Sequence, residues 1–322
     1  MYFWKKLKKP IYVIAPMANV TDVAFRSMFA KYGKPDVMWT EFVSADGLCS
    51  PGKKMLLRDL EFAENERPIV AQLFSAHSEK MKEASALMQK LGFDGIDLNM
   101  GCPDRSVEKQ GSGAAHIKNF EVAKEIIESA RAGAPLLSIS VKTRLGYNSV
   151  DLSWIEFLLK LNLPALTVHL RTRKEMSDVP ARWDLMPKIV ELRNKISPET
   201  LIIGNGDVTS LKDAEKKIKE SGCDGAMIGR GIFGNPWFFS GKIVSEISPK
   251  ERLKVMLEHA KAFDKLLGDV KNFAIMKKHF KAYVSGWDGA KELRVKLMEV
   301  NNVKEVEKIV KEYLDNDLKM VE

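Results

Sequence analysis

The chain has 322 residues, of which 45% are hydrophobic and 29% are charged, a balance too apolar for a disordered polyelectrolyte and too charged for a bundle of membrane helices. Its length suits either two domains or one α/β barrel with a small appendage. The formal net charge of +8 indicates a solvated basic surface or a polyanionic partner, and charge alone does not choose between them.

From the N-terminus to about residue 245, short β-rich apolar runs alternate with amphipathic helical patterns. This alternation is typical of a parallel sheet whose strands are joined by helices. Because the alternation gives eight such units with short returns from helix to strand, it predicts a TIM (β/α)8 barrel rather than an open doubly wound sheet. The predicted strands cover residues 11–18, 36–43, 68–74, 95–101, 136–144, 165–172, 200–207 and 225–231.

The helices between these strands are predicted from their apolar spacing and from residues typical of helix ends. In the segment 77–92, Ser78 is suited to cap the start of the helix and Gly92 to end it. Similar helices are predicted over residues 119–133, 151–162, 183–196 and 210–222.

After residue 248 the strand-like runs stop, and apolar residues recur at helical spacing. Residues 250–300 carry twelve Lys or Arg and seven Asp or Glu, so much of the positive excess lies in this part of the chain. The sequence therefore predicts two domains, a barrel over residues 1–247 and a small all-α domain over residues 248–322. The four predicted helices cover residues 249–267, 269–286, 288–300 and 303–314.

The three cysteines predict neither a disulfide framework nor a zinc site, because they are odd in number, widely spaced and without a CxxC pair. The N-terminal lysines are followed by Pro10 and a short apolar run, which is not the continuous apolar core of a signal peptide. No stretch approaches the ~18 apolar residues of a membrane span. We therefore expect a cytoplasmic protein with no metal and no membrane partner.

In α/β barrels the active site lies at the C-terminal ends of the strands. Here the seventh and eighth strands end in GNGD, residues 204–207, and GRG, residues 229–231. Backbone N–H groups of glycines can approach an oxyanion closely, and the following NPWFF segment, residues 235–239, is predicted to form a short helix with a positive N-terminus. These loops predict a ligand that carries a phosphate, although glycines also suit tight turns.

Two further strand ends carry groups suited to chemistry. Lys142 ends an otherwise apolar strand, and a lysine in a barrel mouth is costly unless it meets an anion. A reduced flavin is such an anion, and a salt bridge within the mouth is the alternative. Cys102 lies at a strand end, where it is suited either to catalysis or to packing as a small buried side chain. Cys223 lies at the opposite end of the barrel and is expected to pack, and Cys49 has no evident partner.

Taken together, these strand ends resemble the dihydrouridine synthase family, flavin enzymes that reduce specific uridines in transfer RNA. The resemblance spans nearly the whole chain, and NMGCP with the following Val107 is its most diagnostic part. The matching stretches are APMANVTDVAFR, VAQLF, GIDLNMGCP, VKTR, TVHLRTR, IIGNGDV and MIGRGIFGNPWFF, with MKKHFKAYVSG and LR in the helical region.

The resemblance implies a monomeric FMN-dependent tRNA-dihydrouridine synthase. Hydride from reduced FMN would go to C6 of uracil, Cys102 would give a proton to C5, and NADPH or NADH would reduce the flavin again. The implied FMN-binding residues are Pro16, Met17, Ala18, Gln72, Asn99, Lys142, His169, Asn205, Gly206, Asp207, Gly229 and Arg230. The implied tRNA contacts are Arg144, Arg171, Arg173, Lys277, Lys278 and Arg294.

The loop after the sixth strand departs from the family pattern. Leu170 follows His169 where the family usually has glycine, and KEMSDVPARW lacks the expected tyrosine and glycine. The divergence of loop 170–183 leaves the modified position open. Two other readings remain. A flavin barrel that reduces a free enone or pyrimidine, as dihydroorotate dehydrogenases do, has no use for the basic helices, and Lys142 and Cys102 argue against a tRNA-binding protein without catalysis.

Overall fold

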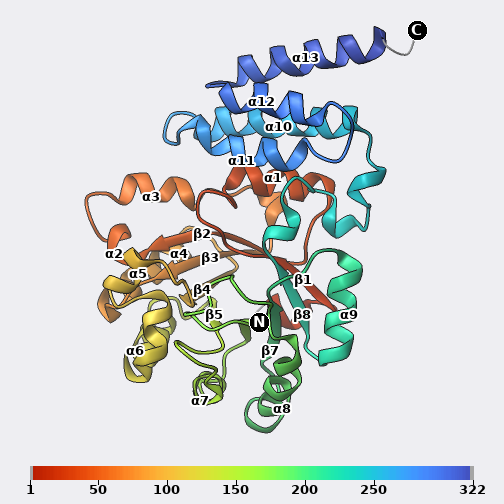
Figure 1. The fold of residues 1–322 in the computed structure, drawn as a ribbon. Coiled ribbons are helices and arrows are strands. Elements are labelled where there is room, and N and C mark those ends of the chain that lie inside the picture. Colours follow the sequence, from red (N-terminus) through yellow and green to blue (C-terminus); the bar gives the residue numbers. More distant parts are fainter. Residues whose placement is uncertain (1–2, 320–322) are drawn as a thin grey trace.

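A computed structural model of the chain describes residues 3–319 (Figure 1). Within that range one sheet contains eight parallel strands, in the order β1-β8-β7-β6-β5-β4-β3-β2. A bridge between Val13 and Val37 joins β1 to the chain entering β2 and closes the sheet, so the predicted barrel is confirmed. The strands are β1 Ile11–Ile14, β2 Met38–Ser44, β3 Ile69–Phe74, β4 Gly95–Met100, β5 Ser138–Arg144, β6 Ala165–His169, β7 Leu201–Asn205 and β8 Gly225–Ile228.

Helices surround the barrel and follow the strands in sequence (Figure 1). Side chains cap the starts of α6, α7 and α9 by accepting a backbone N–H of the first turn, as their sequences predict. The capping residues are Asn119, Asp151 and Ser210. The helices of this part are α1 Val23–Tyr32, α2 Ala45–Leu48, α3 Lys53–Asp59, α4 Ser78–Lys90, α5 Arg105–Lys109, α6 Phe120–Gly133, α7 Leu152–Lys160, α8 Met186–Ile196 and α9 Leu211–Ser221.

Two details of the predicted helices are wrong. Ser78 is the first residue of α4 rather than its cap, and His77 at the cap position makes no side-chain capping hydrogen bond. The helix predicted over residues 183–196 begins with the 3-10 turn Trp183–Leu185, and α8 follows it with a proline in its first turn. In both cases the apolar spacing located the helix, and the local hydrogen bonds moved its start by one to three residues.

The barrel interior changes from apolar to polar along its axis. Trp4, in the 3-10 helix Phe3–Lys6, packs against an apolar layer at the N-terminal end of the strands. That layer contains Ile11, Val13, Val37, Trp39, Val70, Ala165, Ile203 and Met227. Further along β3, β4 and β5 the interior side chains are polar and buried, namely Gln72, Asp97 and Ser140. Groups that can do chemistry therefore gather toward the C-terminal ends of the strands.

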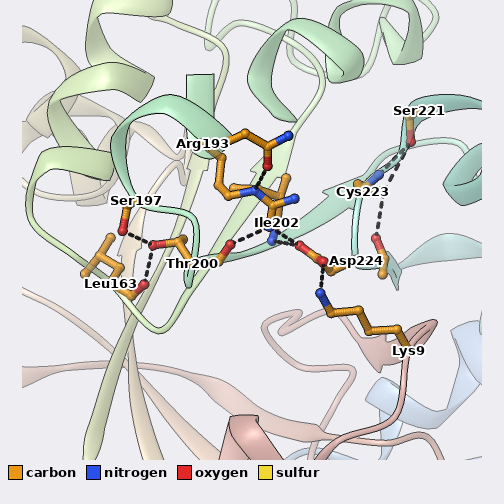
Figure 2. A network of polar contacts seen from close by, with 11 residues as sticks. Lys9, Leu163, Arg193, Ser197, Thr200, Ile202, Ser221, Cys223 and Asp224 are labelled. Atoms are coloured by element: carbon orange, nitrogen blue, oxygen red, sulfur yellow. Dashed lines mark hydrogen bonds and ion pairs between the residues drawn. The ribbon is translucent and has the colours of Figure 1, made fainter. Parts of the chain in front are cut away.

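A polar network fastens the opposite, N-terminal side of the barrel (Figure 2). Asp224 accepts hydrogen bonds from Arg193 Nη1 and from the backbone N–H of Ile202, both at 2.7 Å, and pairs with Lys9 Nζ at 2.5 Å. Cys223 is buried beside it, with its sulfur 3.3 Å from the carbonyl oxygen of Gly225. These contacts join α8, β7, β8 and the N-terminal segment, which agrees with the packing role expected for Cys223.

The C-terminal part forms four helices, stacked on α1 at one side of the barrel (Figure 1). The one predicted over residues 269–286 is shorter than expected, since it covers Met276–Tyr283 after the 3-10 turn Phe273–Ile275. Their apolar core also takes in Val23, Ala24 and Met28 of α1 and Trp237 of the loop after β8. Since α1 contributes to this core, the helical part and the barrel are packed together, and separate domains over residues 1–247 and 248–322 stay a prediction. The helices are α10 Pro249–Leu267, α11 Met276–Tyr283, α12 Ala290–Glu299 and α13 Val303–Lys319.

Two fully buried histidines lie where α10 and α11 meet α1. The rings of His259 and His279 have centroids 4.8 Å apart, and Phe25 lies 5.3 Å from His279. None of the four ring nitrogens has a hydrogen-bond partner within the described part of the chain. Burial lowers the pKa of His259 to about 3, and burial, with His259 beside it, lowers the pKa of His279 well below its usual value. Both rings are therefore neutral in the folded protein.

This pair predicts a loss of stability below neutral pH. The unfolded chain binds protons at these histidines near pH 6.5 and the folded chain does not, so the free energy of unfolding falls as the pH drops. Between pH 7 and pH 6 the wild-type protein should lose about 1 kcal/mol more than the double variant His259→Phe/His279→Phe. Urea unfolding of both proteins at both pH values measures the free energies of unfolding. The other titrating groups are the same in the two proteins, so their contributions cancel in the comparison. Equal losses in the two proteins would contradict the prediction.

Candidate active site

A cavity of about 650 Å³ opens at the C-terminal ends of the strands. Gly206 lies on its wall with φ of +124°, and a Cβ at this position would lie 2.7 Å from Cβ of Ala181. Glycine is therefore required there, because both the backbone angle and the neighbouring Ala181 exclude a side chain. The lining residues are Ala15, Pro16, Met17, Lys142, His169, Arg171, Ser177, Asn205, Gly206, Asp207, Val208, Thr209, Met227, Gly229, Arg230 and Gly231.

The cavity carries an excess of positive charge. Lys142, Arg171 and Arg230 line it together with a single carboxylate, that of Asp207. Arg171 Nη2 lies 2.5 Å from Asp207 Oδ2, and Arg230 Nη2 lies 3.4 Å from Asp207 Oδ1. Because two arginines share one carboxylate and Lys142 is added to them, the site fits an anionic group such as a phosphate.

The Lys142 ammonium group has no hydrogen bond or ion pair with any residue of the range 3–319, so the salt bridge considered as an alternative is not formed there. Burial, followed by the charge of Arg144, lowers the pKa of Lys142 to about 8. His169 next to it is kept neutral, because burial and the charges of Lys142 and Arg144 lower its pKa far below the usual range. Lys142 is therefore still mainly charged at neutral pH, and an anion bound here would raise its pKa again.

The segment that carries Cys102 is fixed by hydrogen bonds on both sides. Asn99 Oδ1 accepts the backbone N–H groups of Gly101 at 3.2 Å and Cys102 at 2.9 Å. Arg144 Nε donates to the Gly101 carbonyl at 2.8 Å, and the N–H of Ala114 donates to the Cys102 carbonyl at 2.9 Å. The thiol is partly buried, and burial raises its pKa, so it is protonated at neutral pH.

The predicted flavin-binding residues fall into two groups. Pro16, Met17, Lys142, His169 and the residues of the seventh and eighth strand ends line the cavity together. Gln72 and Asn99 lie outside the lining, in the barrel interior, where Asn99 Nδ2 donates to Gln72 Oε1 at 2.9 Å. Ala18 is exposed in the loop after β1. Cys102 is also outside the lining. Burial raises the pKa of its thiol, and the charge of Lys142 acts to lower it.

The residues predicted to contact tRNA differ in whether their side-chain donors are already bonded within the protein. Arg144 is 6% exposed, and its Nη1 donates to the carbonyls of Thr172 and Met176, so it fastens loop 170–183. Arg173 pairs with Glu108 of α5 and Arg294 donates to the Val284 carbonyl at 2.8 Å. Lys277 and Lys278 on α11 are partly exposed and form no ion pair within residues 3–319. Among the predicted contacts in the helical part, these two lysines have the free ammonium groups.

The helix expected at NPWFF is wrong. The structure has a single 3-10 turn there, Phe238–Ser240, and Trp237 is buried in the core shared by α1 and the helical part. The helical turn nearest the cavity is instead the 3-10 turn Arg230–Ile232, directly after β8. The packing of Trp237 against Val23, Ala24 and Met28 of α1 accompanies this different path of the chain.

Sequence reasoning missed two contributions to the site. Ser177, in the loop that departs from the family pattern, lines the cavity. Glu108 anchors Arg173, which also lies 5.4 Å from the Tyr147 ring centroid. No local sequence signal pairs Glu108 with a residue 65 positions later. Within residues 3–319, no group of three His, Cys, Asp or Glu side chains is placed to hold a metal, and no helix is long and apolar enough to cross a membrane.

Comparison with known proteins agrees with this geometry. The family model described as dihydrouridine synthase matches residues 13–319. The chain is 40% identical over 325 residues to the probable tRNA-dihydrouridine synthase of Staphylococcus aureus (strain COL), covering 99% of this chain and 98% of that protein. It is 41% identical over 321 residues to the probable tRNA-dihydrouridine synthase 2 of Bacillus subtilis (strain 168), covering 97% and 98%.

Among solved structures, 6-hydroxypseudooxynicotine amine oxidase from Pseudomonas geniculata N1 matches with a TM-score of 0.54 at 12% identity, over 80% of this chain and 53% of that one. That likeness concerns the fold of the barrel alone. The family is established by the match over nearly the whole sequence, which includes the strand ends that form the cavity and the segment that carries Cys102. The chain belongs to the dihydrouridine synthase family.

Proposed function

We propose that this protein reduces the C5=C6 bond of specific uridines in tRNA to 5,6-dihydrouridine, with bound FMN as the cofactor and NADPH or NADH as the electron source. One observation carries the proposal: a positively charged cavity at the strand ends, with Lys142 unpaired in the described range, adjoins the segment that holds Cys102. Family membership and the names of the two bacterial relatives support the same substrate class.

The residues present fit FMN. Arg230 and the backbone around Gly206 and Gly229 would hold the phosphate, because these groups line the cavity and the guanidinium supplies positive charge. Lys142, which lacks a counter-charge among the described residues, would meet the anionic N1–C2 edge of reduced flavin. His169, held neutral, would donate or accept a hydrogen bond without adding charge. Bound reduced flavin supplies the hydride that goes to C6 of uracil.

The remaining step belongs to Cys102. Hydride addition at C6 leaves an enolate conjugated to the C4 carbonyl, which needs a proton at C5. The Cys102 thiol is protonated at neutral pH and is held at a fixed place by its backbone hydrogen bonds, so Sγ–H can deliver that proton. The resulting thiolate takes a proton from solvent before the next turnover. Cys102 therefore acts as a general acid in this proposal.

The substrate is proposed to be a folded RNA because some basic residues, on α11, lie outside the cavity lining. Lys277 and Lys278 of α11 form no ion pair with residues 3–319. Burial lowers the pKa of Lys278, and the carboxylates of Asp22, just before α1, and Glu41, on β2, act in the opposite direction. Phosphate contacts at this side of the mouth would offset the few kcal/mol, roughly, that unstacking a base costs. A tRNA substrate supports a cytoplasmic location.

Replacing Lys142 by methionine should weaken FMN binding about tenfold or more, because a charged hydrogen bond to the flavin is lost. The flavin-free variant should melt at a higher temperature than wild type, because an unpaired, mostly desolvated charge has been removed. Fluorescence titration with FMN and thermal melting measure the two effects, with Lys124→Met on the exposed side of α6 as the control. Unchanged FMN affinity in Lys142→Met would overturn this placement of the flavin.

A further inference from the structure

A chain of side-chain hydrogen bonds runs through the barrel interior from Asp97 to the Cys102 segment. Gln72 Nε2 donates to Asp97 Oδ2 at 2.6 Å, and Asn99 Nδ2 donates to Gln72 Oε1 at 2.9 Å. Asn99 Oδ1 then accepts the N–H groups of Gly101 and Cys102. Asp97 and Gln72 have no exposed surface and Asn99 is 7% exposed, so water does not compete along most of this chain.

The direction of this hydrogen-bond chain is set at both ends, because Asp97 can only accept and the backbone N–H groups of Gly101 and Cys102 can only donate. An amide side chain can present either its oxygen or its nitrogen at a given place, but an ionised carboxylate only accepts. Because Asp97 accepts, Gln72 must turn its nitrogen toward Asp97 and its oxygen toward Asn99. Asn99 must then offer its nitrogen to Gln72, which leaves its oxygen free to accept the two loop N–H groups. Ser140 Oγ donates to the second oxygen, Asp97 Oδ1, at 2.6 Å.

We propose that Asp97 is a positioning residue for Cys102, because it fixes the orientations of the Gln72 and Asn99 amides and thereby holds the backbone N–H groups of Gly101 and Cys102. The inference rests on the proposed role of Cys102 as proton donor. Charged or titratable groups near Asp97 are Lys142 on β5, with Arg144 and Cys102 beyond it. Burial raises the pKa of Asp97 to about 6, so the group is mainly ionised at neutral pH, and Lys142 acts in the opposite direction.

The first test measures how firmly Cys102 is held, in flavin-free protein. Iodoacetamide alkylation of Cys102 is followed by peptide mass mapping, with Cys49 in the same sample as the reference thiol. Asp97→Leu removes the acceptor and should raise the Cys102 rate about tenfold relative to Cys49. Asp97→Asn can still accept from Gln72, and Ser140→Ala leaves the chain intact, so both should stay within about threefold of wild type. Equal rates in all four proteins would overturn the proposal.

The second test reverses the donor–acceptor direction of the hydrogen bonds between residues 97, 72 and 99. It does not require Asp97→Leu to fold. In Asn99→Asp two carboxylates face the Gln72 amide, which can donate to only one of them. One carboxylate must then hold a proton, so the variant should lose stability, relative to wild type, as the pH rises from 5 to 8. In the double variant Asp97→Asn/Asn99→Asp, Gln72 can turn over and satisfy both neighbours. The double variant should therefore recover the stability and the pH dependence of the wild-type protein.

The outcome of the reversal is decisive, because a residue that merely fills space would give additive effects. If the double variant is as unstable and as pH-dependent as Asn99→Asp, Asp97 does not set the direction of the chain and the proposal is wrong. Both tests read alkylation and unfolding of the full chain without turnover. A failure of the proposed enzymatic function, seen as absence of dihydrouridine, is therefore distinguishable from a failure of this inference.

Discussion

The Cys102→Ala variant is expected to form dihydrouridine in tRNA at least about a hundredfold more slowly than the wild-type protein, because it lacks the general acid that protonates C5. FMN binding should persist, since Cys102 does not line the cavity and alanine leaves its backbone hydrogen bonds with Asn99 and Ala114 in place. Reduction of the flavin by NADPH should persist for the same reason. The defect would therefore appear only when RNA is the substrate.

Cys49→Ala is the matched control for this experiment. Cys49 is also a partly buried free thiol, but it follows α2, and its sulfur lies 3.7 Å from the Lys80 carbonyl, away from the cavity. Single-turnover reactions with prereduced protein and a tRNA transcript, followed by mass spectrometry of nucleosides, give the rates directly. Product formation by Cys102→Ala at the rate of Cys49→Ala would show that another group supplies the proton.

Glu66→Leu is expected to destabilise the folded protein by about 3 kcal/mol or more, because it leaves the buried Arg26 guanidinium without its counter-charge. Both side chains have no exposed surface, and Arg26 Nε lies 2.5 Å from Glu66 Oε2. Arg26 also donates from Nη1 to the Thr21 carbonyl at 2.7 Å and from Nη2 to the Glu61 carbonyl at 2.5 Å. This clamp ties the start of α1, on which the helical part packs, to the segment before β3.

Urea unfolding of Glu66→Leu, Arg26→Met and the double variant measures the pair as a thermodynamic cycle. The double variant should be more stable than Glu66→Leu alone, because no unpaired charge remains. Glu191→Gln, which breaks the exposed pair with Lys195, should change the midpoint little. A double variant that is no more stable than Glu66→Leu alone would contradict the charge-based explanation.

The sequence predicted the barrel well because burial on both faces of a parallel strand leaves a continuous apolar run, which is visible locally. It also located the cavity residues at the strand ends, since strand direction fixes which end faces the mouth. The NPWFF segment was predicted wrongly because Trp237 is buried against α1, a distant part of the chain. Ser78 was predicted wrongly because the local hydrogen bonds start the helix one residue earlier than expected.

Side-chain hydrogen bonds between residues on different strands could not be predicted from the sequence. Arg144 has the position and charge of a substrate contact, yet its donors are used on the carbonyls of Gly101, Thr172 and Met176. In the same way, Gln72 and Asn99 stand at positions that the family resemblance assigns to the flavin, and the fold joins them to each other and to Asp97. Only the closed sheet brings β3, β4 and β5 side by side in the register that makes these contacts.

The most direct test of the account is the conversion of uridine in tRNA by the purified protein. The full chain, loaded with FMN and supplied with NADPH, is incubated with a tRNA transcript that contains no modified nucleosides, and the digested RNA is analysed by mass spectrometry. The account predicts a nucleoside heavier than uridine by two hydrogen atoms, formed only when FMN, reductant and protein are all present. Uridine left unchanged by a protein that binds FMN and oxidises NADPH would contradict it.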